Sequence, residues 1–315
     1  MRGAALVTVA AICAVALAGC GFAGEQRSGG FEGDAELRVA TTTNFITDLA
    51  EVIGGDRVEV VGLMGPGVDP HLFKASAGDV DTLSDADLIL YGGLLLEAKM
   101  EDVLEEIGES KPAVPVTRDI PESELLPAPS GAPAEEEFDP HVWFDVSLWK
   151  RAAATVRDEL IALDPGGAPT YEANAERYLA ELDGLDAEVR EQLAEIPRER
   201  RVLVTSHDAF RYLGRAYDLD VAAIQGISTA AEATTADIER VAGLVADRGV
   251  KAVFIESSVP PQTVEAVLAA AERSGQQAVI GGELFSDAAG PAGTPEGTYV
   301  GMVRANVAAL VDGLR

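Results

Sequence analysis

Residues 169–196, PTYEANAERYLAELDGLDAEVREQLAEI, hold the longest periodic run of the chain. Apolar or aromatic residues recur at 171, 175, 178, 182, 185, 189 and 193, which is the period of an α-helix. Pro165-Gly166-Gly167 precedes the run and Pro197 ends it. At ~1.5 Å per residue the helix would be roughly 38 Å long, enough to run along a whole domain. We interpret it as a connection between two lobes; the alternative is one more surface helix of a single domain.

On both sides of this helix, short runs rich in Val and Ile alternate with helical patterns, which is typical of parallel α/β structure. The strand candidates before the helix are Leu37–Ala40, Val58–Met64, Leu88–Tyr91 and Val114–Thr117. Those after it are Val202–Thr205, Val221–Ile224, Ala252–Ile255 and Gln277–Ile280. Helices are expected at 43–53, 235–247, 261–273 and 300–314. We predict an α/β protein of two lobes, each with a four-stranded, mainly parallel sheet flanked by helices, joined by one long helix.

The N-terminus has the features of an export signal. A positive Met1-Arg2 precedes the apolar run Ala4–Ala18, which is too short to span a bilayer comfortably. Leu17-Ala18-Gly19-Cys20 resembles the processing box of bacterial lipoproteins, which implies cleavage before Cys20 and a lipid on that cysteine. The alternative is an ordinary signal peptide with an incidental cysteine. No other stretch has the ~18 apolar residues of a membrane helix.

These signals predict five segments. We expect a lipoprotein-type signal peptide at 1–19, a lipidated cysteine with a flexible Gly-rich tether at 20–35, a first lobe at 36–165, a linking helix at 166–197 and a second lobe at 198–315. The segment 121–137, PESELLPAPSGAPAEEE, is predicted to be an exposed, mobile loop.

The formal net charge of −29 argues against nucleic acid as a partner, because such binding depends on Lys and Arg neutralising phosphates. An acidic surface attracts cations in a general way, although plain solvation explains most of these charges equally well. Only Cys20 would remain after cleavage, since Cys13 lies in the signal, so no disulfide is expected within the mature chain.

The chain has three histidines, His71, His141 and His207. Two lie in Asp-Pro-His tripeptides, and all three follow predicted strands. Ligands of open α/β sheets bind at the carboxyl ends of strands, and imidazole is a common ligand of transition metals. We therefore predict a metal site; histidines used for packing or solvation are the alternative.

The segment after the eighth strand offers two carboxylates, Glu283 and Asp287, as further ligands. Imidazole with carboxylate suits Zn²⁺, Mn²⁺ or Fe²⁺. Ligating histidines usually donate their other ring N–H to a carboxylate or carbonyl. The candidates near in sequence are Asp69, Asp139, Asp145 and Asp208, and Glu256 is either such a partner or a solvated helix start. Five aromatics near the histidines are either a water-excluding shell or ordinary core: Phe73, Trp143, Phe144, Phe210 and Phe285.

Several segments match a family pattern, namely DPHLFKAS (69–76), DPHVWFD (139–145), VTSHDAFRYLGRAYDL (204–219), IQGISTAAEATTADI (224–238), FIESSVPP (254–261), ELFSDA (283–288) and GTYVGMVRANV (297–307). Through them the chain, from about residue 36 to 315, resembles the zinc/manganese substrate-binding lipoproteins of bacterial ABC importers. The resemblance implies two α/β lobes bridged by one long helix that lets them move little. It also implies a metal buried between the lobes with the ligands His71, His141, His207 and Asp287.

The resemblance further implies a function. A monomer, lipid-anchored at Cys20 to the outer face of the cell membrane, would bind one Zn²⁺ or Mn²⁺ ion as transported ligand and deliver it to an ABC transporter permease. Histidine at position 207, where some members have glutamate, favours Zn²⁺. The absence of histidine from 121–137 departs from many zinc-specific members and weakens that preference. Because a bound ion displaces protons from imidazole, affinity is expected to fall below about pH 6.

Three other functions remain as alternatives. A surface adhesin with incidental metal binding has no recognisable site in the sequence. A zinc-dependent hydrolase is disfavoured because three histidines and an aspartate would leave no position for water, and the chain has no HExxH, GxSxG or P-loop. An importer component for haem or a metal chelate would need Tyr, Arg or Lys at the strand ends. We therefore expect no enzymatic activity.

Overall fold

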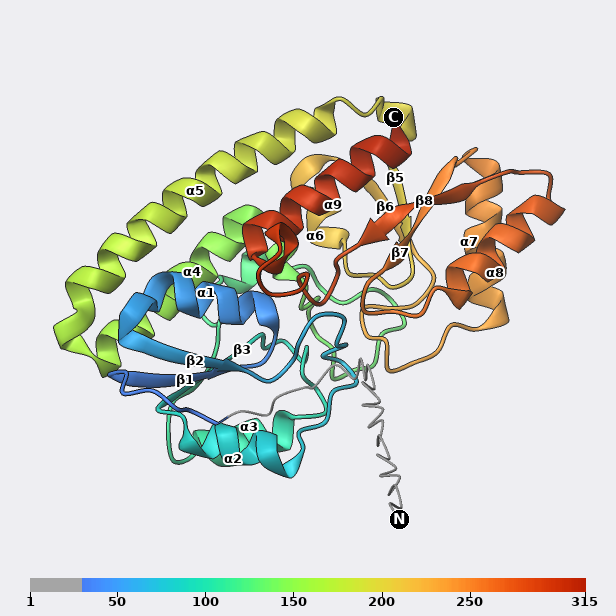
Figure 1. The fold of residues 1–315 in the computed structure, drawn as a ribbon. Helices are drawn as coiled ribbons and strands as arrows, with labels where there is room; N and C mark the ends of the chain where they lie inside the picture. The colour runs from blue at the N-terminus through green and yellow to red at the C-terminus, as the bar shows by residue number, and fades with distance from the viewer. Residues whose placement is uncertain (1–29) are drawn as a thin grey trace, which may run out of the picture.

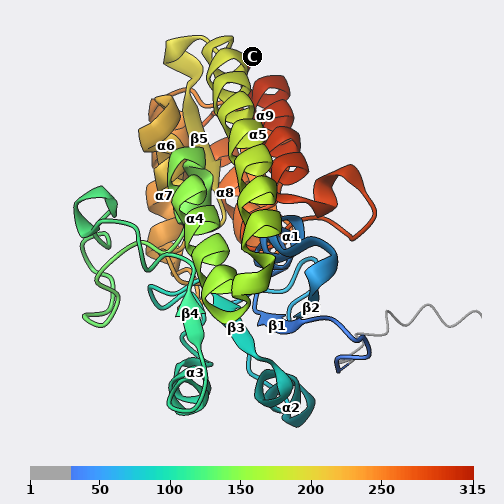
Figure 2. The same ribbon diagram turned by 90° about the vertical axis from the view of Figure 1, so that its left-hand side faces the viewer.

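The structure, a computed structural model, describes residues 30–315; the predicted signal peptide and Cys20 lie outside the described residues. The first lobe holds a parallel sheet in the order β2-β1-β3-β4. Its strands are β1 (Leu37–Thr41), β2 (Val58–Gly62), β3 (Leu88–Tyr91) and β4 (Ala113–Pro115). Its helices are α1 (Asn44–Gly54), α2 (Ala77–Asp85), α3 (Glu101–Gly108) and α4 (Val146–Leu163). Helices α2 and α3 cover one face of the sheet, and α1 and α4 lie on the other (Figures 1 and 2).

The second lobe contains four parallel strands, but they do not form the single four-stranded sheet that was predicted: hydrogen bonds join them as two separate parallel pairs. The strands are β5 (Val202–Thr205), β6 (Asp220–Ala223), β7 (Ala252–Glu256) and β8 (Val279–Leu284), and the helices are α6 (Arg211–Tyr217), α7 (Thr235–Asp247) and α8 (Gln262–Arg273). β5 pairs with β6, β7 pairs with β8, and β5 lies beside β7. At the carboxyl ends of β5 and β7 the Glu256 side chain bridges the gap, accepting the His207 backbone N–H at 2.8 Å. A side chain therefore takes the place of a strand-to-strand bond there.

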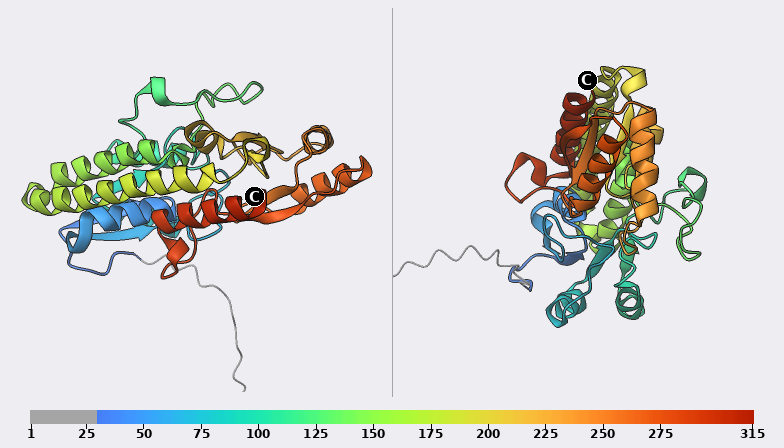
Figure 3. Two further views of the ribbon diagram at one scale, coloured as in Figure 1. Left: turned by 90° about the horizontal axis from the view of Figure 1, so that it is seen from above. Right: turned by 90° about the vertical axis from the view of Figure 1, so that its right-hand side faces the viewer.

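The long predicted helix is present as α5 (Ala168–Ala194). Its buried face contains every apolar position of the sequence period, from Tyr171 to Leu193. The C-terminal helix α9 (Tyr299–Leu314) lies beside it, and Figure 3 shows the two running along the molecule together. Within residues 30–315 no helix combines the length and the apolar character needed to cross a membrane.

One hydrophobic core extends through both lobes. It includes Val39 of β1, Leu185 of α5, Leu203 of β5 and Leu310 of α9, all fully buried. The period of α5 faces this core, so the helix contributes packing to both lobes instead of standing apart as a linker. Burial of apolar surface is the main stabilising term in folding, and here it holds the two lobes together as well.

The last strand departs from its predicted bounds. β8 runs to Leu284 and includes Gly281 and Gly282, which were expected to follow the strand. Close packing requires glycine at 281, because a Cβ there would lie 2.8 Å from the Ala252 Cβ and 3.1 Å from the Phe254 ring. A bulge between Val253 and Phe254 shifts the register beside them. The lack of a side chain at 281 leaves room for the Phe254 ring. Because neighbouring glycines are also typical of loops, the sequence pattern ends the strand too early.

The segment 121–137 is mostly exposed, as predicted. It is tied to the second lobe at Leu126, whose N–H donates to the Tyr212 hydroxyl at 2.9 Å, and at Pro127, whose carbonyl accepts from Arg211 at 2.9 Å. Its predicted mobility stays a prediction.

Candidate metal centre

Four predicted side chains meet between the lobes. His71 follows β2, His141 precedes α4, His207 follows β5 directly and Asp287 follows β8. One ligand atom from each lies within 4.8 Å of all the others. His71 is 2% exposed and the other three are completely buried. The site therefore lies on the carboxyl side of strands from both lobes, as parallel α/β sheets predict.

The closest contacts surround a small central space. The Nε2 atoms of His141 and His207 are 3.3 Å apart. Asp287 places Oδ1 3.5 Å from the His141 Nε2 and Oδ2 3.4 Å from the His207 Nε2. Within residues 30–315, the His71 Nε2 and the Asp287 Oδ1 have no hydrogen-bond partner. Buried polar atoms without partners are costly, and a cation between these four side chains would satisfy both. Their chemistry fits a transition metal.

Two carboxylates orient two of the imidazoles. The Asp139 Oδ1 lies 2.7 Å from the His141 Nδ1, and the Glu256 Oε2 lies 2.5 Å from the His207 Nδ1. In each ring a proton on Nδ1 leaves the Nε2 lone pair facing the central space. Glu256 is thus a partner of a site histidine, one of the two roles considered for it.

The other three predicted aspartates have different roles. The Asp69 side chain accepts the His71 backbone N–H at 2.9 Å and the Thr229 hydroxyl at 2.5 Å. Asp145 caps the N-terminus of α4, and Asp208 lies 3.8 Å from Arg211. Proximity in sequence was therefore a poor guide, because a ring nitrogen and a neighbouring carboxylate often point in different directions.

The repeated Asp-Pro-His tripeptide is explained by a local turn. The backbone N–H of His141 donates to the Asp139 side chain at 3.0 Å, as that of His71 does to Asp69. An aspartate that accepts the N–H two residues later forms a turn mimic, and the intervening proline fixes the backbone. The motif builds the same turn twice and presents one histidine from each.

Burial and neighbouring charge separate the three histidines. Burial lowers the pKa of His71 to about 3. Burial also acts to lower the pKa of His141, but the hydrogen bond with Asp139 and the nearby charge of Asp287 outweigh it and raise that pKa. Asp287 and Glu256 similarly overcome burial and raise the pKa of His207 well above its usual value. The pKa of Asp287 would be raised by burial, yet His207 and His141 hold it well below its usual range. Without an ion, the buried carboxylates therefore favour the protonated forms of His141 and His207, whereas burial favours neutral His71.

The predicted aromatic shell is present in part. Trp143, Phe144 and Phe210 are buried, whereas Phe73 and Phe285 are partly exposed. The Trp143 ring lies 5.1 Å from the His141 ring, and its indole N–H donates to the Ser286 carbonyl at 3.0 Å. This aromatic residue therefore touches a site histidine of one lobe and the backbone beside Asp287 of the other.

The two candidate carboxylates after the eighth strand are clearly distinguished. Glu283 is exposed on β8, whereas Asp287 is buried in the centre. Sequence reasoning missed Ser258, whose hydroxyl donates to the Asp287 Oδ2 at 3.2 Å and lies 2.8 Å from the Ser286 hydroxyl. No pattern in the sequence signals this serine, because its loop follows a different strand.

The chain is similar to known metal-binding proteins along most of its length. The manganese-binding lipoprotein MntA of Bacillus subtilis (strain 168) is 45% identical over 300 residues, covering 95% of each chain. The zinc-binding protein TroA of Treponema pallidum (strain Nichols) is 48% identical over 281 residues, covering 89% of this chain and 90% of that protein. A solved structure of the periplasmic zinc-binding protein TroA from Treponema pallidum matches with a TM-score of 0.85, over 89% of this chain and all of the other.

The family described as "Zinc-uptake complex component A periplasmic" matches residues 39–313, which include both lobes and all four site residues. With the fold, the site and these similarities in agreement, the chain belongs to this family of metal-uptake substrate-binding proteins.

Proposed function

We propose that this protein binds one divalent transition-metal ion, Zn²⁺ or Mn²⁺, outside the cytoplasm and delivers it to an ABC-type permease. The observation that carries the proposal is the buried centre of His71, His141, His207 and Asp287, with the unpartnered His71 Nε2 and Asp287 Oδ1 facing it. In the proposed complex these four side chains ligate the ion, and Asp139 and Glu256 orient two of the imidazoles.

Zn²⁺ is the favoured ion. Three imidazoles and one carboxylate suit tetrahedral Zn²⁺, which also ranks above Mn²⁺ in affinity for most nitrogen and oxygen sites. The similar proteins include one named for manganese and one named for zinc, so both ions belong in the test. Four protein ligands would also leave no position for a reactive water, which supports transport without catalysis.

The proposed arrangement in the cell follows from the segments predicted above. Lobes 36–165 and 198–315 hold the ion between them, and residues 166–197 connect them. A lipid on Cys20 would retain the monomer at the outer face of the membrane beside the permease. Mass spectrometry of the membrane fraction should detect the lipidated cysteine, and Cys20→Ser should release the protein. Retention of that variant would contradict the anchor without affecting the site.

Elemental analysis tests the binding function. The soluble fragment starting after Cys20 is stripped of metal and dialysed against equimolar Zn²⁺ and Mn²⁺. We expect one tightly held ion per chain, mostly Zn²⁺, and its loss in both His207→Ala and Asp287→Asn. The matched control is Glu283→Gln, which changes the other carboxylate of the same segment and should keep the ion. An absence of stoichiometric metal in the unmodified fragment would refute the function.

A further inference from the structure

A small pocket lies against the His71 side of the metal centre. It is too narrow to hold a water molecule, and its lining includes His71, Leu94, Leu95, Glu136, Phe138 and Ser228. The residues come from both lobes, since Ser228 follows β6 and the others belong to the first lobe. His71 is the one site residue in this lining, so the pocket borders the metal centre at that histidine.

Glu136 is the one acidic side chain in this lining. It is half-buried, and its carboxylate makes no hydrogen bond or ion pair within residues 30–315. Its backbone is fixed, because its N–H donates to the Pro133 carbonyl at 3.1 Å. The antiparallel bridge between Pro127 and Phe138 holds the adjoining segment. A positioned but unpartnered carboxylate is therefore available to a cation at this place.

The second observation comes from the centre itself. The His71 Nε2 is buried without a partner, and His71 lines the same pocket as Glu136. Burial is the main cause that raises the pKa of the Glu136 carboxyl, and the negative charge of the neighbouring Glu135 adds to it. The carboxyl is therefore partly removed from water. A carboxylate that has lost part of its hydration gains more from a divalent ion than a fully hydrated one.

We propose that Glu136 is an outer ligand that binds the incoming divalent cation first and passes it to His71. The inference rests on the proposed metal-binding function. The ion would exchange water for carboxylate oxygen at the surface and then for imidazole nitrogen inside. Stepwise replacement spares the ion the cost of losing its whole hydration shell at once. Since the same steps run in reverse, Glu136 lowers the barrier to both binding and release.

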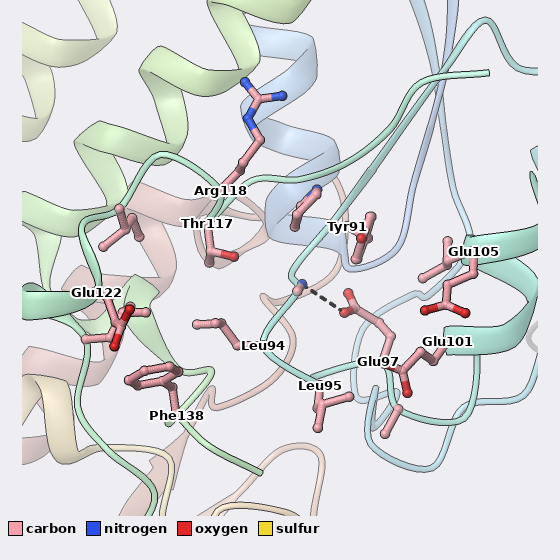
Figure 4. Close-up of a pocket in the computed structure, with 16 residues that line it drawn as sticks. Tyr91, Leu94, Leu95, Glu97, Glu101, Glu105, Thr117, Arg118, Glu122 and Phe138 are labelled. Atoms are coloured by element: carbon pink, nitrogen blue, oxygen red, sulfur yellow. Dashed lines mark hydrogen bonds between the residues drawn. The ribbon is translucent and has the colours of Figure 1, made fainter. Parts of the chain in front are cut away.

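The passage between Glu136 and His71 must widen for transfer, because the pocket has no room for a whole water molecule. Leu94 and Leu95 form one wall, and their φ angles of 55° and 63° place both in the left-handed region. That conformation costs a non-glycine residue roughly 1–2 kcal/mol. Leu94, Leu95 and Phe138 also line a second, larger pocket of about 390 Å³ (Figure 4). The strained wall therefore has space into which it can move.

Stopped-flow fluorescence of the soluble fragment measures the transfer, using Trp143 beside His141 as the reporter. Zn²⁺ and Mn²⁺ provide association rates, and a chelator provides dissociation rates. We expect Glu136→Gln to slow both rates by about tenfold and leave Kd nearly unchanged, because a transient ligand alters the barrier and not the end states. Leu94→Ala, which opens the wall, should accelerate both rates.

Glu135→Gln is the matched control, since Glu135 is exposed and does not line the pocket. If Glu136 acted only through the general attraction of cations to an acidic surface, the two substitutions would slow association equally. That effect would vanish with added salt. Equal effects of the two substitutions, or unchanged rates in Glu136→Gln, would overturn the inference. Unchanged rates in Leu94→Ala would show that the wall of Leu94 and Leu95 does not control the transfer. Failure of the unmodified protein to bind either ion would instead refute the proposed function.

Discussion

The side chain of Asn44 and the backbone of Ala289 exchange two hydrogen bonds, each 2.8 Å long. Asn44 is the first residue of α1 in the first lobe, and Ala289 lies two residues after Asp287. The amide thus fixes the segment that presents the one carboxylate of the metal centre. It also joins the lobes at a point next to the site.

Replacing Asn44 with alanine should loosen Asp287. The substitution leaves the Ala289 N–H and carbonyl unpaired, so we expect a stability loss of about 1–3 kcal/mol and faster release of the ion. Chemical denaturation and chelator-induced dissociation measure the two effects. The control is Asn174→Ala, which removes a 2.9 Å bond to the Ile53 carbonyl far from the site. It should lower stability while leaving the release rate unchanged; equal release rates in the two variants would contradict a role for Asn44 at the site.

Glu256→Gln should weaken metal binding without removing a ligand. The His207 ring loses an acceptor of full negative charge for its Nδ1 proton, and loss of such a partner typically costs about 10–100-fold in affinity. Competition against a chelator of known affinity provides the measurement. Glu265→Gln, an exposed glutamate on α8, should bind as the unmodified protein does. An undiminished affinity in Glu256→Gln would show that Glu256 serves only to bridge β5 and β7.

Much of the fold followed from sequence period and strand composition. The period of α5 predicted its buried face residue by residue, because a helix packed along its full length keeps one apolar stripe. The three histidines were identifiable because they are few and each follows a strand. The choice of Asp287 as a ligand came from the family resemblance, because Glu283 follows the same predicted strand and was an equal candidate by position.

Features that depend on contacts between distant segments were not predictable. β8 was misplaced because its glycines accommodate Phe254 of the neighbouring strand. Glu256 was named as a possible partner of a site histidine, but no local pattern connects it with His207, which lies 49 residues away. Asn44 and Ser258 acquire their roles only when loops from different strands meet.

Metal binding should release protons from His141 and His207 and none from His71, because the pKa values of the first two are raised and that of His71 is lowered to about 3. The two raised histidines hold protons until the ion displaces them, so apparent affinity should decrease as pH falls. His71 is already neutral and contributes none. Titration calorimetry in buffers of different ionisation enthalpy counts the protons. An absence of proton release would contradict this distribution of charge.

Asp48→Asn should stabilise the protein at neutral pH. Burial, opposed by the Tyr299 N–H that the carboxylate accepts at 2.9 Å, raises the pKa of Asp48 to about 6. Since the folded-state pKa lies above the unfolded value, the stability contributed by protonated Asp48 is lost as pH rises from about 4 to about 6. Asparagine keeps the acceptor without the charge, so we expect a gain of about 1–2 kcal/mol at pH 7 and little gain at pH 4. Thermal unfolding at both values measures it.

The control for this variant is Asp81→Asn, an exposed aspartate on α2, which should change stability little at either pH. Equal gains at pH 4 and pH 7 would mean that the charge of Asp48 is not the cause.

Two helices lie side by side along the molecule, and this has a mechanical consequence. Buried residues of α9 and α5, among them Leu310 and Leu185, belong to the same core, and Arg304 of α9 pairs with Glu188 of α5 at 3.0 Å. Two lobes joined by a single helix can rotate about the helix axis, whereas a second helix packed beside the first opposes that rotation. The degrees of freedom that remain belong to loops, and the strained turn at Leu94 and Leu95 is one of them.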